Sequence, residues 1–369
     1  MRWILMASFG SAFALSIVLV LIIRALALRW GFVDRPGGRK RHGRGVPLGG
    51  GLALLLAWGL PVLGAAALSC VWLAHPSILP ISADLADDVA RAASRFPPVG
   101  ALLLGGVAIA LLGLWDDRRD LGAVPKLLGQ ITVAFGIALV PGVRLTIFIG
   151  VTWIEVLVTV VWVVALINCF NMLDNMDGQS GLVAFLTGGA LLVLAMQTSQ
   201  YFIAGMLLAL LGGLLGFLLY NLPPASIFMG DAGSMLTGYV LAVSTTLTTF
   251  IAPGASNPLF PALVPLVIFA VPLYDMVSVL TIRLERGRPL MVGDRNHFAH
   301  RLLRLGMSER MVLVTMGLLV LATAPAATIP YGSSAWQVLV PALQAVSVIC
   351  VIGLLEVASS RFPEQRTDA

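Results

Sequence analysis

Residues 3–28 read WILMASFGSAFALSIVLVLIIRALAL, a long apolar run that carries a single charged side chain, Arg24. A helix that crosses a bilayer needs roughly 17 to 25 predominantly apolar residues. Similar runs follow along the whole chain, so we expect residues 3–28 to form a first membrane span rather than a cleaved leader peptide.

The composition supports the same interpretation. Of the 369 residues, 59% are hydrophobic and 11% are charged, and the mean hydropathy is +0.96, whereas soluble domains carry about 25% charged residues. Backbone polar groups in lipid must be satisfied within their own segment, and the apolar runs are continuous rather than alternating, which favours helices. We therefore expect an all-α integral membrane protein.

Hydropathy predicts a polytopic bundle of about 11 transmembrane helices (10–11) within a single membrane domain, residues 1–369. The expected spans are 3–28, 47–74, 98–115, 124–141, 153–168, 181–197, 201–220, 233–252, 258–282, 309–329 and 335–358. The three cysteines, Cys70, Cys169 and Cys350, show no spacing typical of zinc sites or disulfides.

The 23 Lys and Arg residues lie mostly in alternate loops. Because Lys and Arg near span ends favour the cytoplasm, we expect the N-terminus outside and the C-terminus inside, with a cytoplasmic tail at 359–369. The net charge of +5 follows this sidedness and does not indicate nucleic acid. The same loops hold nearly every polar cluster, which predicts one cytoplasmic site built from residues 29–46, 116–125, 169–180, 221–232 and 283–308.

An aspartate cluster follows the third expected span. The run GLWDDRRD, residues 113–120, places three carboxylates within five residues, and helical spacing brings Asp116 and Asp120 onto one face. A solvated loop neutralised by its arginines is the simple explanation. A charge near hydrocarbon costs roughly 2.5–3.5 kcal/mol, which favours use of the cluster by a divalent cation, a general base, or both.

The fifth expected span ends in NCFNMLDNMDG, residues 168–178, where Asn or Asp recurs every third residue. These side chains converge only if the helix tightens or breaks, and Asn175, Gly178 and Gly181 supply such a break. Their oxygens are hard ligands suited to magnesium. A helix cap followed by a polar turn is the simpler alternative, but it explains one Asn rather than four spaced oxygens.

Three further polar stretches complete the pattern. FMGDAGS, residues 228–234, places Asp231 before the eighth expected span, as an N-cap or as a metal ligand near a helix start that attracts phosphate. RKRHGR, residues 39–44, and DRNHFAHR, residues 294–301, are either lipid-headgroup anchors or phosphate-binding groups. Asp275, inside the ninth expected span, either faces the bundle interior in a functional role or pairs with a neighbouring Arg.

In chain order, these stretches resemble the polyprenyl-phosphate N-acetylhexosamine-1-phosphate transferases of glycosyltransferase family 4, to which WecA, TagO and MraY belong. RKRHGRGVPLGGG is similar to that family's N-terminal loop, WDDRRDL to its aspartate-rich loop, NCFNMLDNMDG to its Asn-Asp motif, FMGDAGS to its Gly-Asp motif, and DRNHFAHRL to its histidine loop. The similarity runs from about Asp34 to Gly306, and five motifs in the same order are far more specific than any one of them.

The resemblance implies an enzyme that transfers N-acetylhexosamine 1-phosphate, in particular GlcNAc-1-phosphate, from a UDP-sugar to polyprenyl (undecaprenyl) phosphate. UMP is released, and a lipid-linked cell-envelope glycan is begun in the multi-pass setting of the cell membrane. The implied partners are UDP-N-acetylhexosamine, polyprenyl phosphate and membrane lipid, without nucleic acid, and a homodimer is compatible with the resemblance.

The resemblance also implies roles for individual residues. Asp116 and Asp117 would be the catalytic carboxylates, and Asn171 and Asp231 would hold Mg²⁺, with Mn²⁺ as a substitute. The implied substrate-binding residues are Lys40, His42, Lys126, Asp174, Asp177, His297, His300 and Arg301.

The sequence departs from the family pattern at two positions and leaves three alternatives. Ala299 replaces a family histidine, which puts the sugar contacts in question, and Asn175 replaces a glycine at a position that Asn also tolerates. The alternatives are a UDP-MurNAc-pentapeptide phosphotransferase, a Mg-dependent membrane prenyltransferase and a secondary transporter. The prenyltransferase leaves the histidine loop unexplained, and a transporter should place ionisable groups near the midplane rather than at one face.

Overall fold

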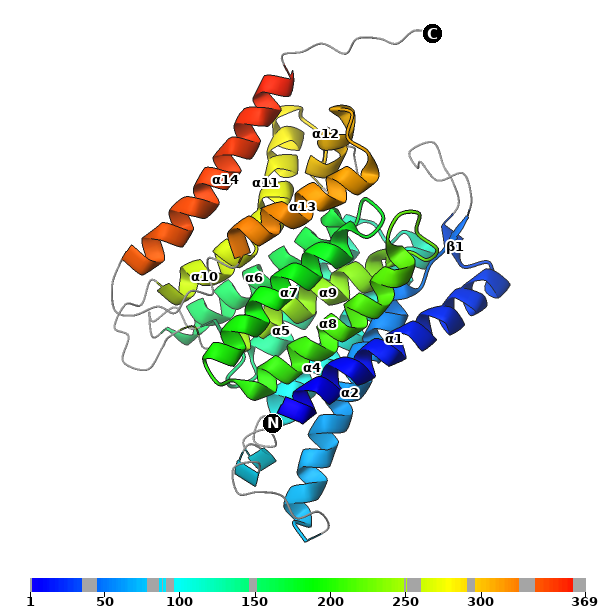
Figure 1. The fold of residues 1–369 in the computed structure, drawn as a ribbon, viewed down its shortest axis with the longest axis vertical. Helices are drawn as coiled ribbons and strands as arrows, with labels where there is room; N and C mark the ends of the chain where they lie inside the picture. Colours follow the sequence, from blue (N-terminus) through cyan, green and yellow to red (C-terminus); the bar gives the residue numbers. More distant parts are fainter. Residues whose placement is uncertain are drawn as a thin grey trace.

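A computed structural model describes residues 2–34, 45–77, 86–87, 89–90, 96–145, 151–248, 250, 260–290, 296–324 and 336–360. Within these residues the chain is helical apart from a short antiparallel pair, β1 (Val33–Asp34) and β2 (Val46–Pro47) (Figure 1). The helices are α1 (Arg2–Trp30), α2 (Gly50–Ala74), α4 (Phe96–Arg119), α5 (Ala123–Ala138), α6 (Thr152–Leu173), α7 (Gln179–Gln197), α8 (Tyr201–Asn221), α9 (Gly230–Leu247), α10 (Phe260–Ile268), α11 (Ala270–Glu285), α12 (Phe298–Arg304), α13 (Glu309–Thr323) and α14 (Trp336–Ser360).

The expected fold class is confirmed: the chain is an all-α, multi-pass membrane protein. In the described part of the chain, six helices are long and apolar enough to cross a membrane, namely α1, α2, α4, α6, α7 and α8. The number of about eleven spans and the sides on which the termini lie stay predictions. The expected tail begins within α14, and its residues 361–369 lie outside the described part.

The ninth span was expected to be one helix, but the structure has two helices in its place, α10 and α11, which meet at Phe269. Pro272 has no backbone N–H, so the carbonyl of Ile268 lacks its helical donor four residues on, and a helix bends or breaks at such a point. The short helix α12 in the following loop was not expected. It places the histidine motif on a helix rather than on an irregular loop.

Helix α9 lies at the centre of the bundle, and all its residues from Ala232 to Leu247 are buried. Helices α2, α4 and α6 pack around it, whereas α1 packs along α8 (Figure 1). The contact between α1 and α8 is close because Ser8 Oγ and Ser16 Oγ donate hydrogen bonds to backbone carbonyls of α8. Small residues commonly allow membrane helices to approach in this way.

Two glycines, Gly51 of α2 and Gly113 of α4, bring their helices into backbone contact with the start of α9. A Cβ atom on Gly113 would lie 2.5 Å from Ala232 Cα, and one on Gly51 would lie 2.2 Å from the Gly233 nitrogen. No side chain larger than hydrogen fits at either position. This crossing fixes the carboxylates at the end of α4 next to the first turn of α9.

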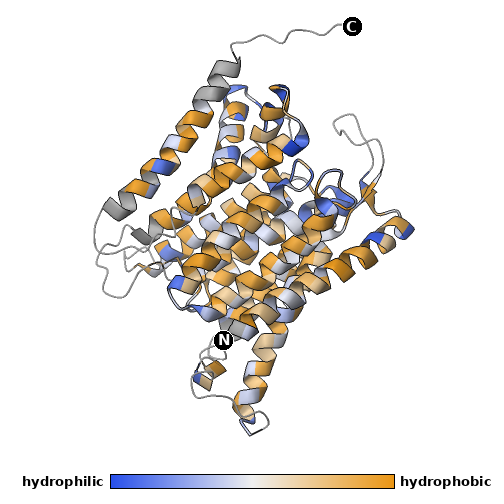
Figure 2. Cartoon of the chain, in the orientation of Figure 1, coloured by the Kyte–Doolittle hydropathy of each residue, from blue (hydrophilic) through white to orange (hydrophobic). Residues whose placement is uncertain are grey.

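Hydrophilic residues gather mainly at the end of the bundle where α12 and β1 lie, whereas the helices between the ends are largely hydrophobic (Figure 2). That end also carries the α6–α7 and α8–α9 connections (Figure 1). The polar motifs, far apart in sequence, therefore meet at one face of the protein.

Candidate active site

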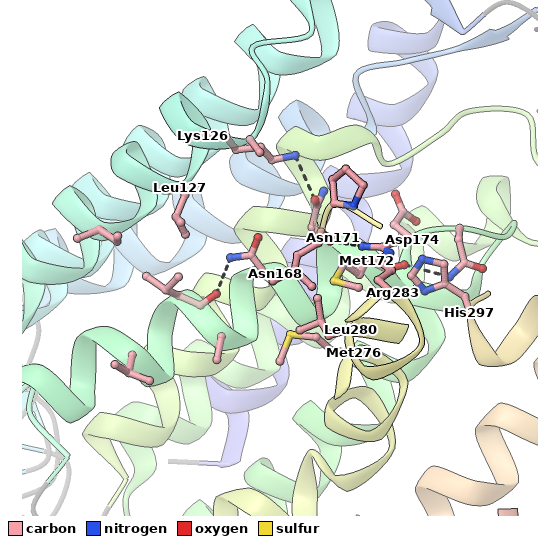
Figure 3. A pocket seen from close by; sticks show the side chains of 18 of the residues that line it. Lys126, Leu127, Asn168, Asn171, Met172, Asp174, Met276, Leu280, Arg283 and His297 are labelled. Atoms are coloured by element: carbon pink, nitrogen blue, oxygen red, sulfur yellow. Dashed lines mark hydrogen bonds between the residues drawn. The ribbon is translucent and has the colours of Figure 1, made fainter. Parts of the chain in front are cut away.

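Lys126, near the start of α5, lies at the centre of the polar cluster. Its ammonium group donates to Asp116 Oδ2 at 2.9 Å, to Asn171 Oδ1 at 3.1 Å and to a carboxylate oxygen of Asp231 (Figure 3 shows the bond to Asn171). These oxygens come from α4, α6 and α9, so one cation joins four helices. The structure thus brings together four of the residues that the sequence selected.

Asp116 and Asp117 are adjacent but bind different partners. The second oxygen of Asp116 accepts the backbone N–H of Leu121 at 2.8 Å. Asp117 accepts the N–H groups of Asp231 at 2.7 Å and of Ala232 at 3.2 Å. Asp117 therefore satisfies the first donors of α9 from a neighbouring helix, a task that capping residues usually perform within their own chain segment.

Asp231 itself lies in the first turn of α9, and Met229 occupies the N-cap position. Gly230 has a φ of +66°, and a Cβ atom there would lie 2.6 Å from a carboxylate oxygen of Asp117. Of the two alternatives left open by the sequence, the structure thus excludes the N-cap for Asp231. Its side chain instead reaches the cationic centre.

The expected break after the fifth span is confirmed. Helix α6 ends at Leu173, and α7 begins at Gln179 after Gly178, which has a φ of +74°. Just before the break, Asn171 is held in one orientation, because its Nδ2 donates to Ser234 Oγ at 3.1 Å while its Oδ1 accepts from the ammonium of Lys126. An amide oxygen fixed in this way is preorganised to bind a cation.

Asp174 follows α6 and lines the cavity described below (Figure 3). Part of its side chain is exposed to that cavity, yet loss of hydration, followed by the negative charges of Asp231, Asp117 and Asp177, raises its pKa well above the usual range. A bound cation would reverse this effect. Four carboxyl groups, of Asp117, Asp174, Asp177 and Asp231, therefore lie close enough to influence one another electrostatically.

Asp177 connects two loops. Its Oδ2 accepts the backbone N–H of Ala225 at 2.8 Å, and nearby the Gly178 N–H donates to Asn221 Oδ1 at 3.0 Å. These bonds tie the α6–α7 connection to the α8–α9 connection. Asp177 is not among the described residues that line the cavity, so its expected contact with substrate stays a prediction.

A cavity of about 1200 Å³ lies between α5, α6 and α11 and extends from the polar cluster into an apolar region. Its polar part joins Lys126, Asn171 and Asp174 to a group of basic side chains from the other wall. The basic group comprises Arg283, Arg288, His297 and His300, and the apolar part is lined by Leu127, Ile131, Leu157, Val160, Val161 and Val164.

The histidine motif contributes to the cavity in part. His297 and His300 line it, with ring centroids 6.5 Å apart. Arg301 instead donates to Ser278 Oγ at 2.7 Å and lies over the ring of Phe298, and it is not among the described lining residues. Ala299 is fully buried, so this position has a packing role in α12.

Two arginines that line the cavity, Arg283 and Arg288, were not selected from the sequence as substrate-binding residues. Both lie within residues 283–308, which the sequence assigned to the site as a loop, but their charges were used only to infer membrane sidedness. Asn168, one turn before Asn171, also lines the cavity and donates to Gln130 Oε1 at 2.6 Å. Asn168 belongs to the quoted Asn-Asp motif, so that motif held the signal.

Some expected site residues cannot be placed. Lys40 and His42 fall within residues 35–44, which lie outside the described part of the chain. Asp294 of the histidine motif also lies outside the described part. In the described part, no three His, Cys, Asp or Glu side chains gather closely enough to form a metal site by themselves. The converging donors are two carboxylates and one carboxamide.

Sequence comparison connects this arrangement to known proteins. Residues 99–249 match the family model of glycosyl transferase family 4. The chain is also 30% identical, over 335 residues, to the decaprenyl-phosphate N-acetylglucosaminephosphotransferase of Mycolicibacterium smegmatis, in an alignment that covers 83% of this chain and 78% of that protein. The chain belongs to glycosyl transferase family 4. The expected family is thus confirmed.

A second family 4 relative is the undecaprenyl-phosphate alpha-N-acetylglucosaminyl 1-phosphate transferase of Escherichia coli K12. It is 28% identical over 329 residues, which cover 85% of this chain and 81% of that protein. The segment that matches the family model extends from α4 to the end of α9. It therefore contains the whole cluster around Lys126, whereas the basic wall of the cavity lies after it.

Proposed function

We propose that this family 4 protein transfers N-acetylglucosamine 1-phosphate from UDP-N-acetylglucosamine to a polyprenyl phosphate, such as undecaprenyl phosphate. One observation carries the proposal: a single cavity joins a polar end, where Lys126, Asn171 and Asp174 meet a wall of basic side chains, to a long apolar end. The names of the Mycolicibacterium and Escherichia relatives support the sugar phosphate and the class of acceptor.

The apolar end suits a polyprenyl chain. Leu157 and Val161 of α6 line it and are at the same time exposed on the surface of the bundle, at 54% and 60%. A lipid would thus enter from the bilayer and lie against aliphatic side chains, with its phosphate directed to Lys126. No charged side chain is among the described residues of this apolar end.

The basic wall suits the diphosphate of the nucleotide sugar. Arginine and histidine bind phosphate oxygens through charge-assisted hydrogen bonds, and Arg283, Arg288, His297 and His300 all reach the cavity. The facing Lys126 would supply a further positive charge. Lys40 and His42 would contribute from the first cytoplasmic loop.

A divalent cation, Mg²⁺ with Mn²⁺ as a substitute, fits the oxygens that converge on Lys126. Asn171 and Asp231 would hold it, since amide and carboxylate oxygens are the ligands such hard cations take. The fit is supported by the ammonium group that these oxygens already bind. When bound, the ion would neutralise charge on the diphosphate.

In the proposed reaction, an oxygen of the lipid phosphate attacks the sugar-bearing phosphorus of the donor. The bond from that phosphorus to the bridging oxygen breaks, UMP leaves with the bridging oxygen, and a polyprenyl-diphosphate-sugar forms. Lys126 and the basic wall align the two anionic reactants, and such positioning supplies most of the rate in phosphoryl transfer. The lipid phosphate is already ionised near neutral pH, so no strong base is needed, and Asp116 would hold the Lys126 ammonium that binds the phosphate.

We place the reaction at the cytoplasmic face of the cell membrane. The distribution of Lys and Arg among the loops supports this orientation, and the basic wall belongs to one of the most basic loops. The loops 29–46, 116–125, 169–180, 221–232 and 283–308 would together enclose the site.

The proposal is tested with the purified full-length protein, UDP-N-acetylglucosamine, undecaprenyl phosphate and Mg²⁺. We expect release of UMP that requires both substrates and stops when the metal is chelated. A prenyltransferase would instead consume an isoprenyl diphosphate, and a transporter would release no UMP. Preference for UDP-MurNAc-pentapeptide in direct competition would identify the other phosphotransferase. Absence of UMP with every donor would refute the proposal.

A further inference from the structure

Asp275 is a buried carboxylate inside α11, with 1% of its surface exposed. A charged group in such a place is costly unless it is fully hydrogen-bonded. The mechanism proposed above does not use this residue, and the sequence left open whether it pairs with an arginine. The hydrogen-bond partners of Asp275 therefore indicate its role.

Both oxygens of Asp275 bind the histidine motif. Oδ2 lies 3.0 Å from His297 Nδ1, and Oδ1 accepts the backbone N–H of Phe298 at 2.6 Å. Neither of these bonds involves an arginine. One carboxylate thus fixes both the imidazole ring of His297 and the backbone at which α12 begins.

The contact determines which nitrogen of His297 is left for other partners. An ionised carboxylate only accepts hydrogen bonds, so Nδ1 must carry the proton and Nε2 is left for other partners. His297 lines the cavity although only 4% of the residue is exposed, so a small part of its surface reaches the open space. Carboxylates commonly fix functional histidines in this way.

Helix α12 has anchors on α11 that do not depend on Asp275. The rings of Tyr274 and Phe298 meet edge to face with centroids 6.1 Å apart, and Arg301 donates to Ser278 Oγ at 2.7 Å. Loss of the Asp275 charge should therefore disturb the ring of His297 more than the attachment of the helix.

We propose that Asp275 is a positioning residue of the donor site: it holds His297 with its proton on Nδ1, so that Nε2 contacts a phosphate oxygen of the nucleotide sugar. The proposal rests on the proposed function for the identity of that ligand. The state of the histidine ring can be measured without it.

The first test is ¹⁵N NMR of the full-length protein in detergent micelles, labelled at its four histidines, with His297→Gln to assign the signal. We expect Nδ1 of His297 to be protonated in the parent protein, whether or not Nε2 also is. An unprotonated Nδ1 would overturn the proposal. This measurement needs no activity, so it is independent of the proposed function.

The second test is a double-mutant cycle on kcat/KM for UDP-N-acetylglucosamine. We expect Asp275→Asn to lower kcat/KM about tenfold or more in the parent, in line with other residues that orient functional histidines. In a His297→Ala background, the same substitution should lower it less than about twofold, because coupled residues are not additive.

The matched control is Ser278→Ala, which removes the Arg301 contact from the same two helices without touching His297. Its effect should be equal in both backgrounds. An equal effect of Asp275→Asn in both backgrounds, or a loss of thermal stability with unchanged kcat/KM, would overturn the positioning role. If the parent released no UMP, the proposed function would fail, while the NMR result would still decide the state of His297.

Discussion

At the scale of single residues, the site depends on one lysine among several carboxylates. Lys126 contacts Asp116, Asn171 and Asp231. These three contacts do not include the nearby carboxylates of Asp117 and Asp174. Breaking a buried ion pair by removing one partner leaves the other charge uncompensated, which is strongly destabilising. The residues of the cluster should therefore respond sharply to changes in charge.

Lys126→Met should lower the rate of transfer at least about a hundredfold, because it removes an electrostatic contact to the reacting phosphates. The variant also leaves two facing carboxylates unbalanced, so its melting temperature should rise more on addition of Mg²⁺ than that of the parent. Thermal unfolding with and without Mg²⁺ measures this difference. Equal Mg²⁺ responses, with parent-like turnover, would remove Lys126 from the site.

Asp231→Asn should abolish transfer and leave the protein folded and inserted in the membrane, because the change removes a charged ligand but little volume. Turnover is measured over a range of Mg²⁺ concentrations, and folding by the thermal transition. Activity close to that of the parent at saturating Mg²⁺ would show that Asp231 is not a metal ligand.

At the scale of helices, the crossing of α4 with α9 holds the site together. Asp117 on α4 satisfies the first N–H groups of α9, and Gly113, one turn earlier, lets the two backbones meet. The sequence could predict the helices themselves, since continuous apolar runs mark them along most of the chain. It could not predict this contact, because hydropathy says nothing about which helices become neighbours.

Gly113→Ala should therefore impair both stability and activity, since the added methyl group would collide with the backbone of α9 2.5 Å away. Inserting volume into a packed contact costs typically 1–3 kcal/mol. The matched control is Gly100→Ala on the same helix, where nothing lies within 4 Å of the added atom. Thermal unfolding of the two variants should differ clearly, and equal melting temperatures would argue against a tight crossing.

The candidate site was predicted only in part, because the sequence does not say which helices become neighbours. Motifs in one order selected Asp116, Lys126, Asn171 and Asp231, which the structure brings together around one ammonium group. The direction in which a side chain points is a property of the packed bundle, so the sequence could not separate the cavity-lining His300 from Arg301, which turns towards Ser278. The break between α10 and α11 was not predicted, and the sequence feature that accompanies it is Pro272.

At the scale of the whole molecule, the proposed reaction requires that the five loops of the site lie on one side of the membrane. Hydrophilic residues gather at the end of the bundle that carries α12 (Figure 2). The polar part of the cavity and its apolar part between α5, α6 and α11 suit a reaction between a soluble nucleotide sugar and a lipid.

Single cysteines in a cysteine-free background test this sidedness. Glu285→Cys, at the exposed end of α11, should react with a membrane-impermeant reagent only from the cytoplasmic side, whereas His75→Cys, at the exposed end of α2, should react only from outside. Intact cells and inverted vesicles supply the two exposures. The reverse pattern would overturn the topology, and reaction of both from one side would refute the single-face arrangement.

In the proposed reaction the sugar moves together with its phosphate. The most direct measurement uses UDP-N-acetylglucosamine that carries ³²P only at the phosphate attached to the sugar, incubated with the purified protein, undecaprenyl phosphate and Mg²⁺. We expect the label to enter the lipid in an amount equal to the UMP released. Label that remains with the nucleotide as UDP, while unlabelled sugar appears on the lipid, would contradict the proposed reaction.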